Sequence, residues 1–114
     1  MAVVWYDHIA DTTTTSGGIA TPVALANAPP QYYNTYGARY TVAQTVPYCI
    51  QHQTLNEWEV GYGTYSAANQ ITRVTVIDSS AGAGTAVTFS AGTKDVFVPA
   101  PSNPIYMGGD TDLT

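Results

Sequence analysis

Apolar and polar residues alternate with a period of two along most of this chain. No window carries an apolar stripe at the helical spacing, so helix is expected to be minor or absent. The alternating runs that predict strands span Val3 to Ile9, Ala38 to His52, Trp58 to Tyr65, Ile71 to Ile77, Thr85 to Ser90 and Asp95 to Val98. We therefore expect an all-β protein in which each strand buries one of its two faces.

Short polar or glycine-rich segments separate these runs. Gln53 to Glu57 and Ser66 to Asn69 have the length and composition of antiparallel hairpin connections. Ser79 to Gly84 and Ala91 to Thr93 are further turns, and this regular spacing is typical of a sandwich or barrel. For the 114 residues we predict a single-domain antiparallel β-sandwich or small barrel over 1–98, followed by an extended C-terminal arm over 99–114.

The alternation also predicts the core. The residues expected to supply much of it are Trp58, Val60, Tyr62, Val74, Val76, Val96 and Val98. They alternate with residues expected on the opposite face, which are Glu59, Gly61, Arg73, Thr75 and Phe97. In the second strand the shared apolar face carries Tyr40, Val42, Val46, Tyr48 and Ile50. Pro47 interrupts that strand and predicts an edge position or a bulge, because proline cannot donate to the sheet ladder.

The composition excludes several classes of function. Charged residues make up 10% of the chain, against roughly 25% in ordinary soluble domains. The net charge is -5 and Arg39, Arg73 and Lys94 are the cations, so we exclude nucleic acid as a direct ligand. The chain shows no signal peptide and no apolar run long enough to span a bilayer, so we expect it to fold in the cytoplasm and to bind no membrane. Cys49 is the single cysteine, which leaves neither an internal disulfide nor a Cys-rich zinc site.

Several residue pairs invite a catalytic interpretation. Glu57 and Glu59 share a strand face with Cα atoms about 7 Å apart, within the range of glycosidase carboxylates. Acids flanking a buried Trp58 are nevertheless typical of a solvated strand face, which is the interpretation we favour. Cys49 and His52 could pair as nucleophile and base, but their odd separation places them on opposite strand faces. The sequence therefore predicts no enzyme, no metal and no cofactor.

The region from Asp11 to Gly37 has no clear period and is rich in proline and tyrosine. A long excursion of this kind in a compact domain is typically a functional loop or a disordered one, and the tyrosines argue against disorder. Tyr32, Tyr33 and Tyr36 could form a carbohydrate-stacking platform, because aromatic rings combine apolar faces with polar edges. They suit a protein interface as well, and we favour the interface because tyrosine is enriched there.

Three stretches of the chain resemble a family. Trp58 to Tyr65 (WEVGYGTY), Arg73 to Val76 and Phe89 to Phe97 (FSAGTKDVF) are similar to a small β-rich module of tailed bacteriophages, found in head-fibre, head-decoration and tail-fibre proteins. The resemblance extends over about Val3 to Pro99. It implies a virion structural protein without catalysis, expected to be a head decoration, cement or head-fibre protein. The alternative that it admits is a tail- or fibre-associated module that binds host-surface glycan.

The expected partners follow from this resemblance and from the composition. We predict contact with the major capsid protein or another virion protein, in a particle assembled in the host cytoplasm. Low charge and open strand edges predict a homo-oligomer, and the three-fold sites of viral shells and fibres suggest a trimer. The predicted partner-binding residues lie in the loop and in the proline-stiffened arm: Tyr32, Tyr33, Tyr36, Pro101, Pro104, Ile105, Tyr106 and Met107.

Overall fold

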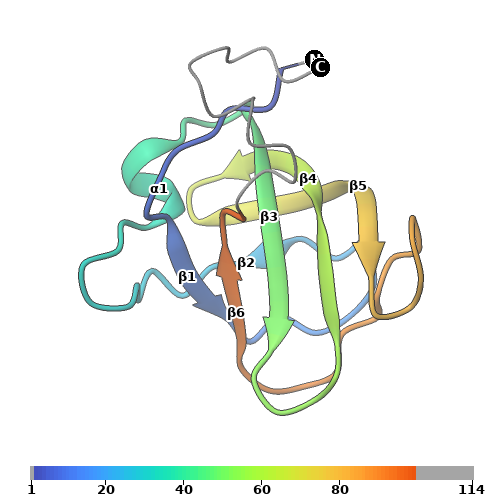
Figure 1. Cartoon of the computed structure of the whole chain (residues 1–114). Coiled ribbons are helices and arrows are strands. Elements are labelled where there is room, and N and C mark those ends of the chain that lie inside the picture. The colour runs from blue at the N-terminus through green and yellow to red at the C-terminus, as the bar shows by residue number, and fades with distance from the viewer. Residues whose placement is uncertain (1, 100–114) are drawn as a thin grey trace.

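The computed structural model describes residues 2–99, and its regular secondary structure is almost entirely strand (Figure 1). Its elements are β1 (Ala10–Thr13), β2 (Val23–Ala24), α1 (Tyr36–Arg39), β3 (Thr45–His52), β4 (Trp58–Ala67), β5 (Gln70–Ser79) and β6 (Lys94–Phe97). They form one six-stranded sheet in the order β1-β6-β3-β4-β5-β2, with antiparallel pairing between neighbouring strands. The predicted all-β class is confirmed. No helix in residues 2–99 is long and apolar enough to cross a membrane.

The two outer strands of this sheet meet, so the sheet forms a nearly closed barrel. Thr13 at the end of β1 bridges Leu25, just beyond β2. The Thr13 hydroxyl donates to the Ala24 carbonyl at 2.6 Å, and the N–H of Ala26 donates to the Thr12 carbonyl at 2.8 Å. The open strand edges expected from the sequence are therefore closed against each other in this part of the sheet, and they supply no argument for an oligomer.

Three predicted strands differ from the observed ones. The stretch from Val3 to Ile9 forms only isolated bridges, and His8 within it has φ 56, outside the extended region. The second strand begins only at Thr45, because the short helix α1 occupies its expected start. The stretch from Thr85 to Ser90 contributes a bridge between Phe89 and Gly17 and no longer strand.

Pro47 lies in β3 near the middle of the sheet order, yet its nitrogen faces an unpaired side. The N–H of His52 donates toward β4 and that of Gln53 toward β6, so by alternation the nitrogen of Pro47 faces the β6 side. The ladder with β6 covers only Cys49 to His52. At Pro47 the strand is therefore locally an edge, as the proline predicts.

The core differs from the predicted one because β4 and β5 are turned over. The buried apolar cluster consists of Ile9, Val23, Leu25, Tyr36, Tyr40, Val46, Tyr48, Ile50, Tyr65, Ile71, Val87, Phe89 and Val96, with Val98 packed against it. The predictions for Val96 and Val98 and for the face of β3 are confirmed. Val42 is wrong, since it is 57% exposed and precedes the strand.

On β4 and β5 the predicted core residues face outward. Trp58, Val60 and Tyr62 are half-buried and Val74 is 50% exposed, while Glu59, Gly61 and Arg73 point inward. Val76, which was also predicted to lie in the core, is only half-buried. The register shifts of the β4–β5 ladder, between Val60 and Gly61 and between Tyr62 and Gly63, break the simple alternation along β5.

Candidate functional site

A buried ion pair fills the barrel interior at the inverted face. Arg73 Nη1 donates to Glu59 Oε1 at 2.9 Å, and the side chains are 2% and 0% exposed. The N–H of Val87 donates to the same oxygen at 2.8 Å, and the Tyr48 hydroxyl donates to Oε2 at 2.6 Å. Glu59 is thus held by three hydrogen bonds from β3, β5 and the segment before β6. The expected solvated face is wrong for Glu59.

The guanidinium of Arg73 also donates hydrogen bonds to backbone carbonyls of two other segments of the chain, at Val87 and Gly17. Nη1 also donates to the Val87 carbonyl at 3.1 Å, and Nη2 donates to the Gly17 carbonyl at 3.2 Å. Its carbon lies 5.4 Å from the centroid of the Phe89 ring, within cation–π range. Burial, followed by the hydrogen bond to Glu59, raises the pKa of Tyr48 well above its ordinary value.

Two glycines of β4 let the β5 backbone approach closely beside this cluster. A Cβ added to Gly61 would clash with the Thr75 carbonyl oxygen, and it would lie 3.0 Å from the Tyr48 hydroxyl. A Cβ on Gly63 would clash with the Thr72 carbonyl oxygen. The Glu-x-Gly-x-Gly spacing therefore places a carboxylate and two close approaches of the β5 backbone along the same face of β4.

The other reactive groups are also committed to internal contacts. Nδ1 of His52 accepts from the N–H groups of Thr54 and Leu55, so Nε2 carries the proton and donates to the Ala91 carbonyl at 2.9 Å. Cys49 is buried on the opposite face of β3, and burial raises the pKa of its thiol to about 11. The expected separation of Cys49 from His52 is confirmed.

Lys94 and Glu57 also make hydrogen bonds within the described residues. Lys94 is 0% exposed, and its Nζ donates to the Thr15 carbonyl at 2.9 Å. Burial lowers the pKa of Lys94, although Glu57 opposes the shift. Glu57 accepts from the N–H and hydroxyl of Ser90, and these bonds lower its pKa. Glu57 and Glu59 therefore serve different contacts and do not flank one cleft.

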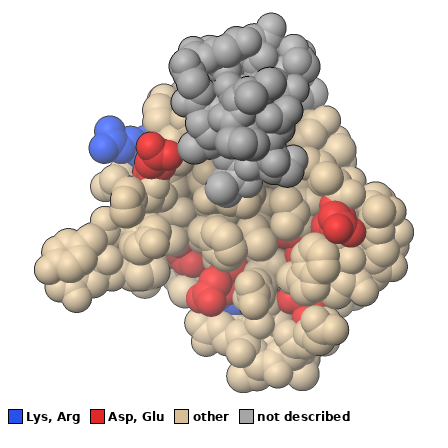
Figure 2. All heavy atoms as spheres, in the orientation of Figure 1, with Lys and Arg blue, Asp and Glu red and all other residues tan. Residues whose placement is uncertain are grey.

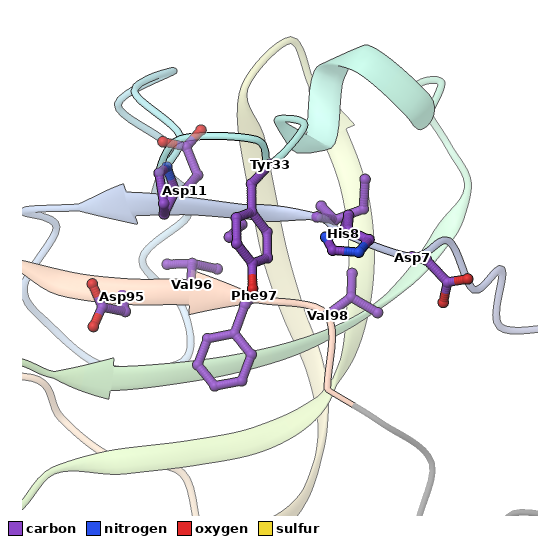
Figure 3. Close-up of a pocket in the computed structure, with 11 residues that line it drawn as sticks. Asp7, His8, Asp11, Tyr33, Asp95, Val96, Phe97 and Val98 are labelled. Atoms are coloured by element: carbon purple, nitrogen blue, oxygen red, sulfur yellow. The ribbon is translucent and has the colours of Figure 1, made fainter.

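The described surface contains a groove of about 740 Å³ beside β1 and β6 (Figure 3). Its lining residues come from the start of β1 and the residues before it, from the end of β6 and from the loop 30–33. Tyr33, His8 and Phe97 stand in the middle of the view, with Asp11 and Asp95 at one end and Asp7 at the other. The His8 and Tyr33 ring centroids are 5.2 Å apart with an interplanar angle of 57°.

Local hydrogen bonds hold this groove in shape. The N–H of Tyr33 donates to the Pro30 carbonyl at 3.0 Å, and the N–H of Asn34 donates to the His8 carbonyl at 2.8 Å. Asp11 is 1% exposed and accepts from the N–H groups of Thr12, Asn27 and Ala28. The loop that carries Tyr33 is thus pinned to β1 at both of its ends.

The groove is acidic. Asp7 and Asp95 are exposed, and one Asp95 oxygen accepts from Gln53 Nε2 at 2.9 Å. None of the described lining residues is Lys or Arg. Since Arg73 and Lys94 are buried, Arg39 is the exposed cation of residues 2–99. Figure 2 shows a face that is mostly uncharged, with more acidic than basic groups visible.

A second surface feature is an apolar band, here called the β4–β5 outer face. It consists of Trp58, Val60, Tyr62, Val74 and Ile77. Val74 and Ile77 are 50% and 57% exposed. The inverted register of β4 turns Trp58, Val60 and Tyr62 outward, whereas Val74 and Ile77 lie at the two register shifts along β5.

The predicted partner-binding tyrosines are separated by the structure. Tyr33 is 44% exposed and lines the groove, whereas Tyr32 is 88% exposed and does not. The prediction for Tyr36 is wrong, because its ring is 0% exposed in the core and its hydroxyl donates to the Pro47 carbonyl at 3.2 Å. The remaining predicted residues, Pro101, Pro104, Ile105, Tyr106 and Met107, lie outside the described residues.

Sequence reasoning missed the groove residues Asp7, Asp11, Asp95 and Phe97. Alternation predicts that Phe97 faces outward. Asp95 lies two residues earlier on the same strand, so it is expected on the same outer face. Nothing in the sequence brings Asp7 or Asp11 to β6, because that contact depends on the pairing of β1 with the last strand.

Neither similarity to known proteins nor a metal-binding arrangement identifies the function of the described site. No protein-family model, curated protein or solved structure matches this chain. Within residues 2–99, no group of three or more His, Cys, Asp and Glu side chains is arranged to hold a metal ion.

Proposed function

We propose that this chain is a non-catalytic structural protein of a tailed-bacteriophage virion, a head decoration, cement or head-fibre protein that binds the capsid shell and oligomerises. The observation that carries the proposal is that the buried ionisable groups contact one another and the backbone, whereas apolar and aromatic side chains lie exposed at the surface. The ionisable groups of the barrel interior, Glu59, Arg73 and Lys94, form internal hydrogen bonds. The surface offers apolar and aromatic side chains instead.

The β4–β5 outer face supports a binding role. Contiguous exposed apolar side chains on a soluble domain mark interaction sites. Val74 and Ile77 lie at the register shifts of β5, next to Thr75 and Asp78, which pair with Tyr62 and Val60 of β4. Exposed apolar side chains therefore lie on both of these paired strands, with Thr75 and Asp78 between them. We infer that this face packs against another copy of the chain in a trimer or against the shell.

The structure explains why several residues of the phage-module motif are needed for the fold. Glu59 and Arg73 form the buried ion pair, and Gly61 and Gly63 allow the β5 backbone to approach β4 closely. The same motif contains Trp58 and Val60, whose side chains belong to the β4–β5 outer face, so it describes the interior and part of this surface together.

A matched pair of substitutions tests the role of the outer face. Val74→Ser removes an apolar side chain that is 50% exposed in the patch, whereas Val42→Ser removes one that is 57% exposed outside it. We expect Val74→Ser to lower the occupancy of the protein on purified particles or its oligomer mass, and Val42→Ser to leave both unchanged. Equal effects of the two variants would contradict the assignment of the patch.

The loop and arm are tested separately. The exposed Tyr32 and Tyr33, together with residues 101–107, remain the proposed shell contacts. Deletion of 102–114 is expected to leave the barrel folded and to lower either particle occupancy or the resistance of the particles to heat. Unchanged occupancy and heat resistance would show that the arm is dispensable.

A second function, glycan binding by a tail- or fibre-associated module, is favoured by one observation. The groove combines the rings of Tyr33 and Phe97 with exposed carboxylates, a combination that can stack on and hydrogen-bond a sugar. Strong binding of the purified protein to oligosaccharides, with its location confined to the tail, would select this function over the first.

A further inference from the structure

We propose that the acidic groove beside β1 and β6 binds an arginine or lysine side chain carried on an extended segment of the shell protein. This inference rests on the proposed function, since the shell supplies the partner. The groove is distinct from the β4–β5 outer face, because its lining comes from β1, β6 and the loop 30–33.

The shape of the groove suits a long side chain. Its volume of about 740 Å³ is in the range of sites that take a small ligand, and it is lined from three separate segments. The backbone groups at its rim are already paired, with Ala10 N–H donating to the Asn34 carbonyl and Val98 N–H donating to the Ile9 carbonyl. Strand addition is therefore not the mode of binding here, and side-chain insertion is.

The negative charge of the groove favours a positively charged ligand. Asp7, Asp11 and Asp95 contribute three carboxylates, and no Lys or Arg lies among the described lining residues. The oxygens of Asp11 are already bonded to backbone N–H groups, so Asp11 adds charge to the floor. Asp7 and the second oxygen of Asp95 remain as exposed acceptors at opposite ends of the groove.

The aromatic rings favour a guanidinium in particular. A planar guanidinium stacks on an aromatic face and binds carboxylates through several N–H donors. Tyr33 and Phe97 present rings in the groove between the two exposed carboxylates (Figure 3). An inserted arginine can therefore contact a ring and reach an acid at the same time.

A neutral sugar fits the same surface less well. Each sugar hydroxyl both donates and accepts hydrogen bonds, so a sugar site needs donors as well as acceptors. Among the lining side chains the available donors are the Tyr33 hydroxyl and the His8 ring, whereas the available acceptors are both oxygens of Asp7 and the second oxygen of Asp95. The excess of acceptors is matched by a ligand that only donates, as arginine and lysine do.

The test uses the full chain and a defined probe. The ¹⁵N NMR spectrum is titrated with an acetylated, amidated Gly-Arg-Gly peptide, with the same peptide carrying citrulline in place of arginine, and with maltotriose. We expect the arginine peptide alone to shift the amides of residues 7–11, 30–34 and 95–98, with shifts that weaken as salt rises.

Two single-charge variants make the assignment specific. Asp95→Asn removes a groove carboxylate and Asp78→Asn removes an exposed carboxylate outside it. The dissociation constant should rise about two- to five-fold in Asp95→Asn, as for an exposed ion pair, and should stay unchanged in Asp78→Asn. Tyr33→Ala should weaken binding, whereas Tyr32→Ala outside the lining should not.

Three results would overturn the inference. These are an absence of shifts at the groove, equal shifts from the citrulline peptide, and groove shifts produced by maltotriose instead. The proposed function fails separately, if the protein is absent from purified particles. A protein present in particles whose groove ignores arginine would sink this inference alone.

Discussion

The sharpest consequence of the inverted strands concerns Glu59. In the predicted arrangement its carboxylate faces solvent and its loss would cost little. In the structure it is 0% exposed and accepts hydrogen bonds from Tyr48, Arg73 and Val87. Glu59→Gln keeps the shape and one carbonyl oxygen but removes the charge that neutralises the buried Arg73.

The expected magnitude follows from this geometry. Removing one partner of a buried ion pair costs about 3–5 kcal/mol, because the other charge stays buried without compensation. The glutamine carbonyl can still accept from the Val87 N–H, and the glutamine NH2 group can donate to the Tyr48 hydroxyl oxygen in place of accepting from it. Glu59→Gln should therefore lie near the lower end, at about 3 kcal/mol. A domain of this size has roughly 5–15 kcal/mol of stability, so the variant should still fold.

The assay is urea unfolding at pH 7, followed by far-ultraviolet circular dichroism and by the fluorescence of Trp5 and Trp58. The dependence of the unfolding free energy on urea should keep its slope, so that the shift in midpoint reports stability. Asp78→Asn, which removes an exposed carboxylate, is the control and should change the free energy by less than about 0.5 kcal/mol.

A double-mutant cycle separates the ion pair from general packing. Arg73→Met should also destabilise, and the double variant Glu59→Gln/Arg73→Met should cost at least about 1 kcal/mol less than the sum of the single changes. Additive costs, or a loss below about 1 kcal/mol for Glu59→Gln alone, would refute the buried pair.

The remaining predictions concern space, desolvation and pH. Gly61→Ala should destabilise by about 1–3 kcal/mol or more in urea unfolding because its Cβ clashes with a strand carbonyl, whereas Gly18→Ala, with no neighbour within 3.4 Å, should not. Lys94→Met should be neutral or stabilising by thermal unfolding, because it removes the desolvation of a buried amine that has one hydrogen bond to Thr15; a large loss would contradict this. At alkaline pH the chain should lose stability as the pH rises from about 9 toward 11, because the folded state holds the Cys49 proton more tightly than the unfolded state does. Buried Tyr36, Tyr40 and Tyr48, whose pKa values burial also raises, add to this loss from about pH 10 upward. The lowered pKa of Lys94 acts in the opposite direction, so Cys49→Ala should flatten the fall and Lys94→Met should steepen it; an unchanged profile in Cys49→Ala would refute the assignment.

The sequence predicts the fold class well and the orientation of two strands badly. Alternation gives the strand positions of β4, β5 and β6, because one face of each is buried. Alternation cannot say which face of a strand is buried when both faces carry apolar groups. Because tryptophan is usually buried in preference to glutamate, the sequence predicts the wrong face of β4 as the inner one. Glu59, Gly61 and Arg73 point inward because the glycines allow close packing and the charges neutralise each other.

The candidate site was predictable only in part. Tyr33 could be found from the proline- and tyrosine-rich loop, and it is exposed as expected. Tyr36, three residues later, is buried because α1 turns it into the core, and the sequence gives no strong signal for a four-residue helix. The acidic lining depends on the contact between β1 and β6, which joins residues more than eighty positions apart and follows only from barrel closure.

The most direct test of the proposed function is to locate the protein on an intact particle. Cryo-electron microscopy of purified particles, compared with particles that lack this protein, should reveal additional density on the outside of the head, repeated with the symmetry of the shell. A barrel of the size described here should fit that density, with three copies around each site. Density confined to the tail, or particles that do not contain the protein, would contradict the proposal.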